Sequence, residues 1–287
     1  MLIELAIGDA YGAGFEYVKP EIITKYNNLE YRQHPTHKGT KPGMYTDDTQ
    51  MSLAIAELMV EELEWTKLNV ANKFVEVFKR DVREGYASGF YHFLTKMNNG
   101  EMFLENIKPY SDKSGAAMRA PVLGIYKDRK EVLEKTEIQA SVTHDTKDGI
   151  NAAKASAMIV HFFLWESGKK KDLAKYLKDH VKGDWASRWT GKVRSKGWMS
   201  VRAAITAIQE ADSMSDLLTK CVAYTGDVDT VAAIALAGGS VCKELRNDLP
   251  GWLYSGMEDG EFGRTYIESL DKELKAFYLQ GKQDLPL

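Results

Sequence analysis

The sequence predicts an all-α protein, and three observations carry this prediction. Apolar residues recur at helical spacing over most of the 287 residues, alternating runs typical of half-buried strands are scarce, and only seven prolines interrupt the pattern. The clearest stripe follows Asp48 at the i, i+3, i+4, i+7 and i+8 positions of one helix face, namely Met51, Ala54, Ile55, Leu58 and Met59. Similar patterns predict helices near 70–78 and over 148–166, 201–211, 215–223, 229–245 and 262–279.

The composition is that of one globular domain, which we expect to span residues 1–287 without an internal linker. Hydrophobic residues make up 44% and charged residues 28% of the chain, and the net charge of −3 suggests no nucleic-acid or anionic-membrane surface. Cys221 and Cys242 belong to no zinc or disulfide pattern, which fits a reducing, cytoplasmic environment. The most apolar stretch, 150–165, is too short and too polar for a membrane span and predicts a buried helix.

Two predicted helices begin at acidic segments, Thr46-Asp47-Asp48-Thr49 and Gly226-Asp227-Val228-Asp229-Thr230. Capping is one explanation, because side-chain oxygens satisfy free backbone N–H groups and carboxylates suit the positive end of the helix dipole. However, capping needs one acceptor, and each segment offers two carboxylates with hydroxyls beside them. If the two helix starts met, their carboxylates would repel one another unless a cation neutralised them, and oxygen ligands favour Mg²⁺, Mn²⁺ or Ca²⁺ over zinc. Spacing alone leaves both interpretations open.

Three further segments combine small and polar residues in ways that suit a ligand site. Residues 8–16 place glycines between Asp9 and Glu16, which indicates either a tight loop facing a ligand or a glycine-rich helix end. Residues 111–119 form a polar loop that leads into small residues, and free N–H groups there could hold phosphate, although an ordinary capped helix would look the same. His144 precedes the alanine-rich helix, where a histidine more often caps or packs than binds a ligand.

In their order along the chain, these segments resemble the motifs of the ADP-ribosylglycohydrolase family, which includes the dinitrogenase-reductase-activating glycohydrolase and the ADP-ribosyl-acceptor hydrolases. The resemblance covers nearly the whole chain. The segments that carry it are Gly8-Asp9-Ala10 with Gly12 and Glu16, Thr46-Asp47-Asp48-Thr49 with Met51, Gly115-Ala116-Ala117-Met118-Arg119, Thr143-His144, and Gly226-Asp227-Val228-Asp229-Thr230 with Ala232, Ala233 and Ile234. One such motif would be weak evidence of the family, whereas five in order are specific.

The resemblance implies a compact single-domain orthogonal helical bundle with two Mg²⁺ ions, or Mn²⁺ in their place, in a central cleft. It also implies that the metal ligands are Thr46, Asp47, Asp48, Asp227, Asp229 and Thr230. Glu16 is expected at a mobile flap over the metals, and His144 is expected near the ribose. The loop expected to bind the diphosphate contains Ser114, Gly115, Ala116 and Met118.

Two departures from the family pattern fall in this loop and at the second acidic segment. The loop often reads Gly-Asn-Gly in the family but reads Lys113-Ser114-Gly115 here, which predicts a shortened loop and leaves its phosphate and acceptor contacts open. Two glycines usually precede the second pair of aspartates, and Thr225 replaces one of them.

The implied activity is hydrolysis of the N- or O-glycosidic bond between ADP-ribose and an acceptor, which would be an arginine or serine side chain of a protein or a small molecule. The metals would bind hydroxyls of the distal ribose and orient a water toward the anomeric carbon, and cleavage would pass through an oxocarbenium-like state. Asp47 or Asp48 is expected as the general base, and Glu16 either closes the site or protonates the leaving group. We expect a monomer that acts on ADP-ribosylated proteins or small ADP-ribosyl compounds, without nucleic-acid or membrane partners.

Two alternatives belong to other functional classes. A prenyl-transferring, Mg²⁺-dependent enzyme would need a second acid about one helical turn after the first, but Thr49-Gln50-Met51-Ser52 follows Asp48. The second alternative is a catalytically weak module of the same fold that binds ADP-ribose or a partner protein. Such a module would not need to keep every metal ligand, so the complete set argues against it. The unusual middle loop favours it.

Overall fold

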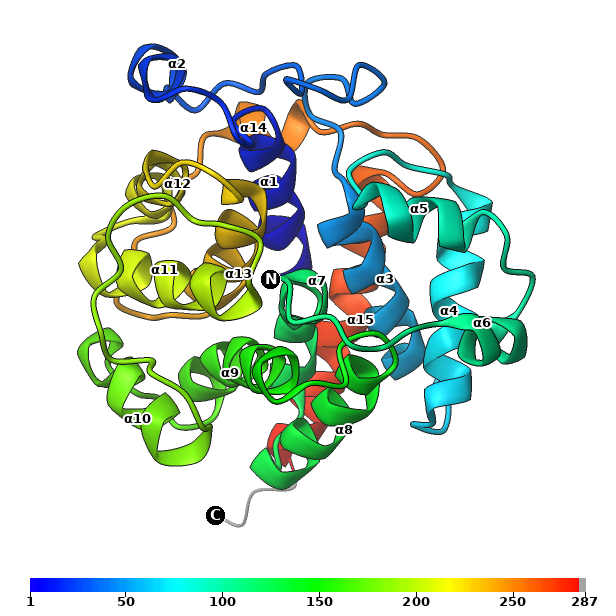
Figure 1. Cartoon of the computed structure of the whole chain (residues 1–287). Helices are drawn as coiled ribbons and strands as arrows, with labels where there is room; N and C mark the ends of the chain where they lie inside the picture. The colour runs from blue at the N-terminus through cyan, green and yellow to red at the C-terminus, as the bar shows by residue number, and fades with distance from the viewer. Residues whose placement is uncertain (284–287) are drawn as a thin grey trace.

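The helices predicted from the apolar stripes surround one core in the computed structural model, which describes residues 1–283 (Figure 1). The α-helices are α1 (Leu2–Ala13), α2 (Pro20–Tyr26), α3 (Asp47–Val60), α4 (Lys67–Arg80), α5 (Ser88–Leu94), α6 (Gly100–Asn106), α7 (Gly115–Met118), α8 (Arg129–Ser141), α9 (Lys147–Leu164), α10 (Leu173–His180), α11 (Gly197–Glu210), α12 (Met214–Ala223), α13 (Val228–Ser240), α14 (Gly251–Ser255) and α15 (Arg264–Gln283). Two short 3₁₀ helices are η1 (Ala120–Ile125) and η2 (Lys170–Asp172). Within residues 1–283 there is no strand, only isolated bridges, so the predicted all-α class is confirmed.

The centre of the fold is the contact between α1 and α13 (Figure 1). Every residue of α1 is buried, so the helix has no solvent-facing side. A Cβ atom on Gly8 would lie 2.5 Å from the carbonyl oxygen of Ala232. One on Gly12 would lie 2.4 Å from the Cα atom of Asp229. The close crossing therefore requires glycine at both positions, and it brings the end of α1 against the start of α13.

Two further groups of helices pack around this pair. α3 contacts α1 and packs against α4 and α15, whereas α9 packs against η1, α8, α11 and α7. α15 closes the molecule onto its own N-terminus, because the terminal ammonium group of Met1 lies 2.9 Å from Oδ2 of Asp271 and 2.6 Å from Oε2 of Glu4. In Figure 1, α1 lies between α3 and α13, the two helices that begin with acidic segments.

The predicted helix ranges need two adjustments. Residues 8–13 belong to α1, so this part of the glycine-rich segment is a helix end and a turn follows it at 14–17. The helix predicted over 229–245 was too long at its C-terminus, because α13 ends at Ser240. Gly238 and Gly239 favour its last turn poorly, and the N–H of Val241 bonds back to the carbonyl of Gly238, an i→i−3 contact that ends the helix.

The apolar segment 150–165 lies almost wholly within the buried helix α9, as predicted. Its histidine is satisfied inside the protein, since Nδ1 of His161 lies 3.1 Å from the Tyr176 hydroxyl and Nε2 lies 3.1 Å from the Lys127 carbonyl oxygen. Among the described residues, no helix has the length and apolar character that crossing a membrane requires.

Candidate metal centre and substrate cleft

The start of α3 is capped by a residue from another helix. Asp9, in α1, accepts hydrogen bonds from the backbone N–H groups of Thr46 and Thr49, both at 2.9 Å, and from their hydroxyl groups, both at 2.6 Å. The side chain of Thr46, the N-cap residue, makes no capping bond to the helix. Asp9 is fully buried, so these donors satisfy its carboxylate and hold α3 against α1.

Because Asp9 caps the helix, Asp47 and Asp48 are not needed as caps. Both line a cleft, and although Asp48 is buried, its Oδ1 atom has no hydrogen-bond partner within the described residues. Gly85 packs closely against Asp47, since a Cβ atom on Gly85 would lie 2.7 Å from Oδ1 of Asp47. Capping therefore does not account for the carboxylates of the first acidic segment.

The second acidic segment begins at a tight turn. Thr225 and Gly226 have φ angles of 65° and 94°, both in the left-handed region. Gly226 forms a bridge with Val193, and a Cβ atom on Gly226 would lie 1.8 Å from the Val193 carbonyl oxygen. That carbonyl accepts the N–H of Asp227 at 3.2 Å, while the N–H of Tyr17 donates to the Gly226 carbonyl at 2.9 Å. These bonds fix the start of α13 beside the turn that follows α1.

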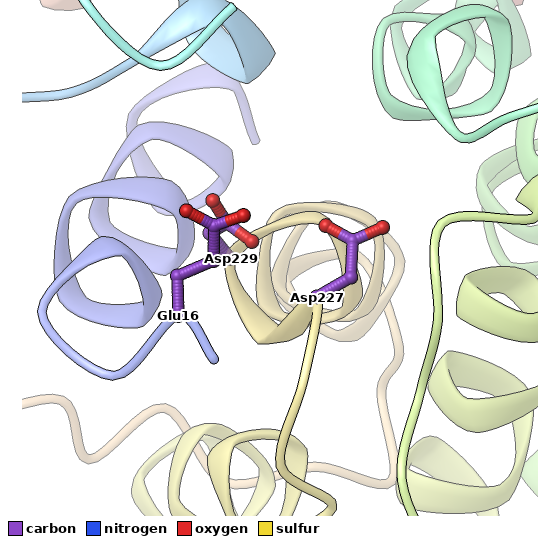
Figure 2. A group of neighbouring side chains, drawn as sticks. All are labelled: Glu16, Asp227 and Asp229. Carbon is purple, nitrogen blue, oxygen red and sulfur yellow. The ribbon is translucent and has the colours of Figure 1, made fainter. Parts of the chain in front are cut away.

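Three carboxylates from these two elements share one space (Figure 2). One oxygen from each of Glu16, Asp227 and Asp229 lies within 4.8 Å of the other two. Glu16 comes from the turn at 14–17, and the two aspartates come from the start of α13. Asp229 is only 6% exposed, and its Oδ1 atom has no hydrogen-bond partner in the described part of the chain. Glu16, expected at a flap, is thus grouped with two predicted metal ligands.

Burial and mutual repulsion raise the pKa values of the clustered aspartates. Burial is the main cause for Asp47, Asp48 and Asp229, whose pKa values lie well above the usual range, and neighbouring carboxylates add to it. Burial, followed by repulsion from Glu16, raises the pKa of Asp227 to about 6. Asp48 is affected by Asp227, and Asp229 is affected by Asp48, so the two helix starts meet in one electrostatic site.

This donor set fits divalent cations. Among the side chains that the structure describes, no Lys, Arg or His forms an ion pair with Asp47, Asp48, Asp227 or Asp229. A buried carboxylate oxygen that lacks both a cationic partner and a hydrogen bond, as Oδ1 of Asp48 and Oδ1 of Asp229 do, is costly, and a bound cation would remove that cost. The oxygen-only character of the set matches the preference of Mg²⁺ and Mn²⁺.

Glu16 is held by a histidine from the loop that precedes α3. His34 is buried, and its Nδ1 atom accepts the backbone N–H groups of Thr36 at 3.2 Å and His37 at 3.0 Å. The proton on Nε2 is therefore available to Oε2 of Glu16, which lies 3.1 Å away. Glu16 thus bridges this loop and the start of α13, and its expected mobility stays a prediction.

The cleft has a volume of about 760 Å³ and is lined by four residues predicted to bind substrate, namely Ser114, Gly115, Met118 and His144. Ala116 is placed differently: it is fully buried, and its carbonyl accepts a hydrogen bond from Nε2 of Gln139 at 3.1 Å. Lys108 and Lys113 also line the cleft, together with the aromatic residues Tyr86, Phe90 and Tyr91.

Several residues that shape the site were not predicted as site residues. Asp9 and Arg119 lie inside the motifs that pointed to the family, but only their burial and hydrogen bonds show what they do. Gly85 and Lys108 belong to no motif, and no sequence signal marks them. For Arg119 one sequence signal of a site residue was available, namely a charged residue at the end of the run of small residues 115–118.

The sequence of this chain is similar to those of known proteins. The sequence model of the family described as ADP-ribosylglycohydrolase matches residues 1–281. ADP-ribosylhydrolase ARH3 of Xenopus tropicalis is 29% identical over 195 residues, which cover 63% of this chain and 54% of that protein. ADP-ribosylarginine hydrolase Tri1 of Pseudomonas putida (strain GB-1) is 24% identical over 265 residues, which cover 83% of this chain and 68% of that protein. The matched region spans about half the length of the ARH3 relatives.

A solved structure described as an ADP-ribosylglycohydrolase-related protein complex shares the fold. The two chains superpose with a TM-score of 0.75 at 20% sequence identity, over 96% of each chain. This likeness supports the fold alone, whereas the family match covers nearly the whole sequence. The chain therefore belongs to the ADP-ribosylglycohydrolase family.

Proposed function

We propose that this protein is a hydrolase that cleaves the glycosidic bond between ADP-ribose and an acceptor, with two divalent cations, Mg²⁺ or Mn²⁺, at the two acidic helix starts. One observation carries the proposal. Asp48 and Asp229 are buried, and each has a carboxylate oxygen without a hydrogen-bond partner among the described residues, while Asp9 already caps α3. The residues that would hold the cations are Thr46, Asp47, Asp48, Asp227, Asp229 and Thr230.

The hydroxyl groups of this set complement its carboxylates. The Thr46 hydroxyl donates its hydrogen to Oδ1 of Asp9 at 2.6 Å, which leaves the lone pairs of its oxygen for a cation. Thr230 lines the same cleft as Asp48 and lowers the pKa of its carboxyl, so its hydroxyl belongs to the same group of oxygens. When bound, the cations would supply Lewis-acid activation of water and of ribose hydroxyls.

The protein's own side chains account for the proton transfers. Hydrolysis joins the oxygen of water to the anomeric carbon and breaks the bond from that carbon to the acceptor, so one proton leaves the water and one reaches the leaving group. We assign Asp47 or Asp48 to accept the water proton, because both carboxylates line the cleft. We assign Glu16 to the leaving group or to closure of the site, because His34 fixes only one of its oxygens.

The remaining walls of the cleft suit an ADP group. Lys108 and Lys113 provide positive charge for a diphosphate, and the loop that contains Ser114 lies between Lys113 and α7. Phe90 and Tyr91 offer rings against which an adenine base could stack. A cleft of about 760 Å³ is within the usual range for a ligand of this size.

The acceptor in this proposal is N- or O-linked. One relative is named an ADP-ribosylarginine hydrolase and another an ADP-ribosylhydrolase, so their names alone leave the linkage open. Arginine and serine side chains of proteins and small ADP-ribosyl compounds are therefore the substrates to test.

The test measures release of ADP-ribose from ADP-ribosylated arginine and serine peptides, with Mg²⁺ and with a chelator. We expect release with Mg²⁺ and little without it. Asp48→Ala and Asp229→Ala should reduce the rate by at least about 100-fold, the scale of losing an essential group. Asp179→Ala, which changes an exposed aspartate in α10 outside the cleft, should keep the wild-type rate.

Two outcomes would overturn this proposal. Wild-type rates in the Asp48 and Asp229 variants would exclude the metal assignment. Tight binding of ADP-ribose by calorimetry, without release from any acceptor, would identify the chain as a binding module of the same fold.

A further inference from the structure

Arg119 is the largest of the fully buried side chains, and no acidic residue among the described ones forms an ion pair with it. Its guanidinium group lies 4.4 Å from the centre of the Phe74 ring and donates to the Gly115 carbonyl at 2.8 Å. Nε donates to Oε1 of Gln139 at 2.6 Å, and Nη2 donates to the Gln139 carbonyl at 3.1 Å. A buried charge without an acid partner is costly, so its position points to a specific role.

A further hydrogen bond of Arg119 leads to the cleft. Nη2 donates to Oγ1 of Thr143 at 2.9 Å, and the same hydroxyl oxygen lies 2.7 Å from Nδ1 of His144. A threonine hydroxyl carries one hydrogen, and Thr143 is buried with no other acceptor for it among the described residues. The hydrogen therefore points to Nδ1, which makes Nδ1 an acceptor and leaves the imidazole proton on Nε2.

The Nε2–H group of His144 remains available to a ligand. The ring lines the cleft and is only 7% exposed, and its Nε2 atom has no hydrogen-bond partner among the side chains and backbone atoms that the structure describes. Gly115 leaves room for the ring, because a Cβ atom there would lie 3.0 Å from Cε1 and 3.3 Å from Nε2. Burial, together with the charge of Arg119, lowers the pKa of His144 to about 3, so the ring is neutral at physiological pH.

We propose that Arg119 and Thr143 are positioning residues that hold His144 as a neutral Nε2–H donor for an oxygen of the ADP-ribosyl group. The identity of the ligand rests on the proposed function, whereas the tautomer rests on the hydrogen-bond chain alone. The opposite tautomer would present a lone pair to the same oxygen and repel it. His144 therefore orients substrate and does not act as the acid or base of the reaction.

The same arginine couples this donor to the start of α7. Arg119 bonds to the carbonyl of Gly115, and Gln139, its other partner, donates to the carbonyl of Ala116. The start of α7 and the His144 ring are thus positioned by one network anchored on α8. Ala116 does not line the cleft, but its carbonyl belongs to this network.

The test is the ¹⁵N NMR spectrum of histidine-labelled protein without ligand, with the His144 signals assigned from a His144→Gln sample. We expect wild type to show protonated Nε2 and unprotonated Nδ1, unchanged between about pH 5 and pH 8, since the pKa of His144 lies below this range. Thr143→Val removes the hydroxyl and should give a mixture of tautomers, and Thr143→Ser should restore the wild-type spectrum. Thr136→Val is the matched control, because Thr136 is a buried threonine of α8 whose hydroxyl has no partner among the described residues.

Calorimetry with ADP-ribose then links the tautomer to binding. Thr143→Val should bind about tenfold more weakly than wild type, the effect of one hydrogen bond, while Thr143→Ser and Thr136→Val should bind like wild type. A wild-type Nδ1–H tautomer, or an unchanged spectrum in Thr143→Val, would overturn the inference whatever the enzyme does. If the tautomers behave as expected but no ADP-ribosyl substrate is cleaved, the proposed function fails and the positioning role stands.

Discussion

At the scale of single residues, Asp9 and Asp48 differ in how their buried carboxylates are satisfied. Both are buried, but the Asp9 carboxylate accepts hydrogen bonds from two threonines, whereas Oδ1 of Asp48 has no partner within the described residues. Burial raises the pKa of Asp9, and its hydrogen bonds act against that rise. Asp48 has fewer compensating bonds and more repulsion from other carboxylates, which supports its proposed role as a cation ligand.

Neutralising one carboxylate of the cluster should stabilise the metal-free protein. Burial raises the folded-state pKa of Asp229 well above the usual range of an aspartate, so its contribution to stability is lost as pH rises through the folded pKa. In a chelator at pH 8, Asp229→Asn removes this loss and should raise the unfolding free energy by about 1–2 kcal/mol. Mg²⁺ should stabilise the same variant much less than it stabilises the wild-type protein.

Thermal unfolding by circular dichroism, with chelator and with Mg²⁺, measures both effects. Asp179→Asn, at an exposed site in α10, is the control and should behave like wild type in both conditions. An Asp229→Asn protein that is less stable than wild type in chelator would contradict the repulsion argument.

Thr225 is a residue whose local geometry predicts a stabilising substitution. Its φ of 65° is unfavourable for a β-branched side chain, at a position where the family usually has glycine. Thr225→Gly should raise the unfolding free energy by about 0.5–1 kcal/mol, because relief of strain outweighs the greater freedom of glycine in the unfolded chain. Urea unfolding measures this, with Thr225→Val as a control that keeps the branched side chain and should show no gain. Equal stability of the glycine and valine variants would argue against strain.

The aspartates of the site could be predicted from the sequence, but their supporting residues could not. Asp47, Asp48, Asp227 and Asp229 stand in recognisable motifs at helix starts. The partners of Asp9 lie 37 and 40 positions away along the chain, so its capping role depends on a tertiary contact that no local pattern reveals. The link from Arg119 to His144 is hidden for the same reason.

At the scale of helices, periodicity predicted the longer helices with an apolar buried face, but it missed the short helix α10, whose buried residues are apolar, and α8, whose buried face is mixed. The stripe after Asp48 corresponds to α3, and the patterns at 148–166 and 201–211 correspond to α9 and α11. α8 was not predicted, because its buried positions include Thr136 and Gln139 as well as Val132 and Ala140. Polar residues that serve the site thus obscure the helix that carries them.

The crossing of α1 and α13 should not tolerate a side chain at Gly12. Gly12→Ala would place a Cβ atom 2.4 Å from the Cα atom of Asp229, so the helices must separate and Asp229 must move. We expect a loss of at least about 2 kcal/mol of stability, together with weaker Mg²⁺ binding. Chemical unfolding and Mg²⁺ titration measure the two effects.

Gly89→Ala is the matched control for this substitution. Gly89 lies in α5, where an added Cβ atom would meet nothing within 4 Å. The alanine should leave stability unchanged or raise it by about 0.5–1 kcal/mol through better helix propensity. If Gly12→Ala were as stable as Gly89→Ala, the close crossing would not be what positions the start of α13.

At the scale of the whole molecule, the fold supports the proposed metal site over the capping interpretation that the sequence also left open. Each acidic segment alone is compatible with a capped helix. α1 contacts both α3 and α13. Its Asp9 caps α3, and its glycines allow α13 to pack closely against it. Only this arrangement brings carboxylates from segments some 180 residues apart into one cleft, at positions 47–48 and 227–229.

This convergence predicts that Mg²⁺ stabilises the protein more at pH 8 than at pH 6. The pKa of Asp227 is raised to about 6, and those of Asp47, Asp48 and Asp229 also lie well above the usual range, so metal must displace protons at pH 6 but fewer at pH 8. The gain in unfolding free energy at equal Mg²⁺ should be larger at pH 8 by about 1 kcal/mol or more.

The gain is measured as the difference between samples with Mg²⁺ and with NaCl of equal ionic strength, at each pH. Taking the difference cancels the pH-dependent contributions of groups far from the metal. His144 is one such group: its pKa of about 3 lies below the unfolded value of about 6.5, so the protein becomes less stable as pH falls below 6.5, with or without metal. Only protons that compete with the cation change the difference. An equal or smaller gain at pH 8 would mean that the clustered carboxylates do not bind the metal, however closely the fold brings them together.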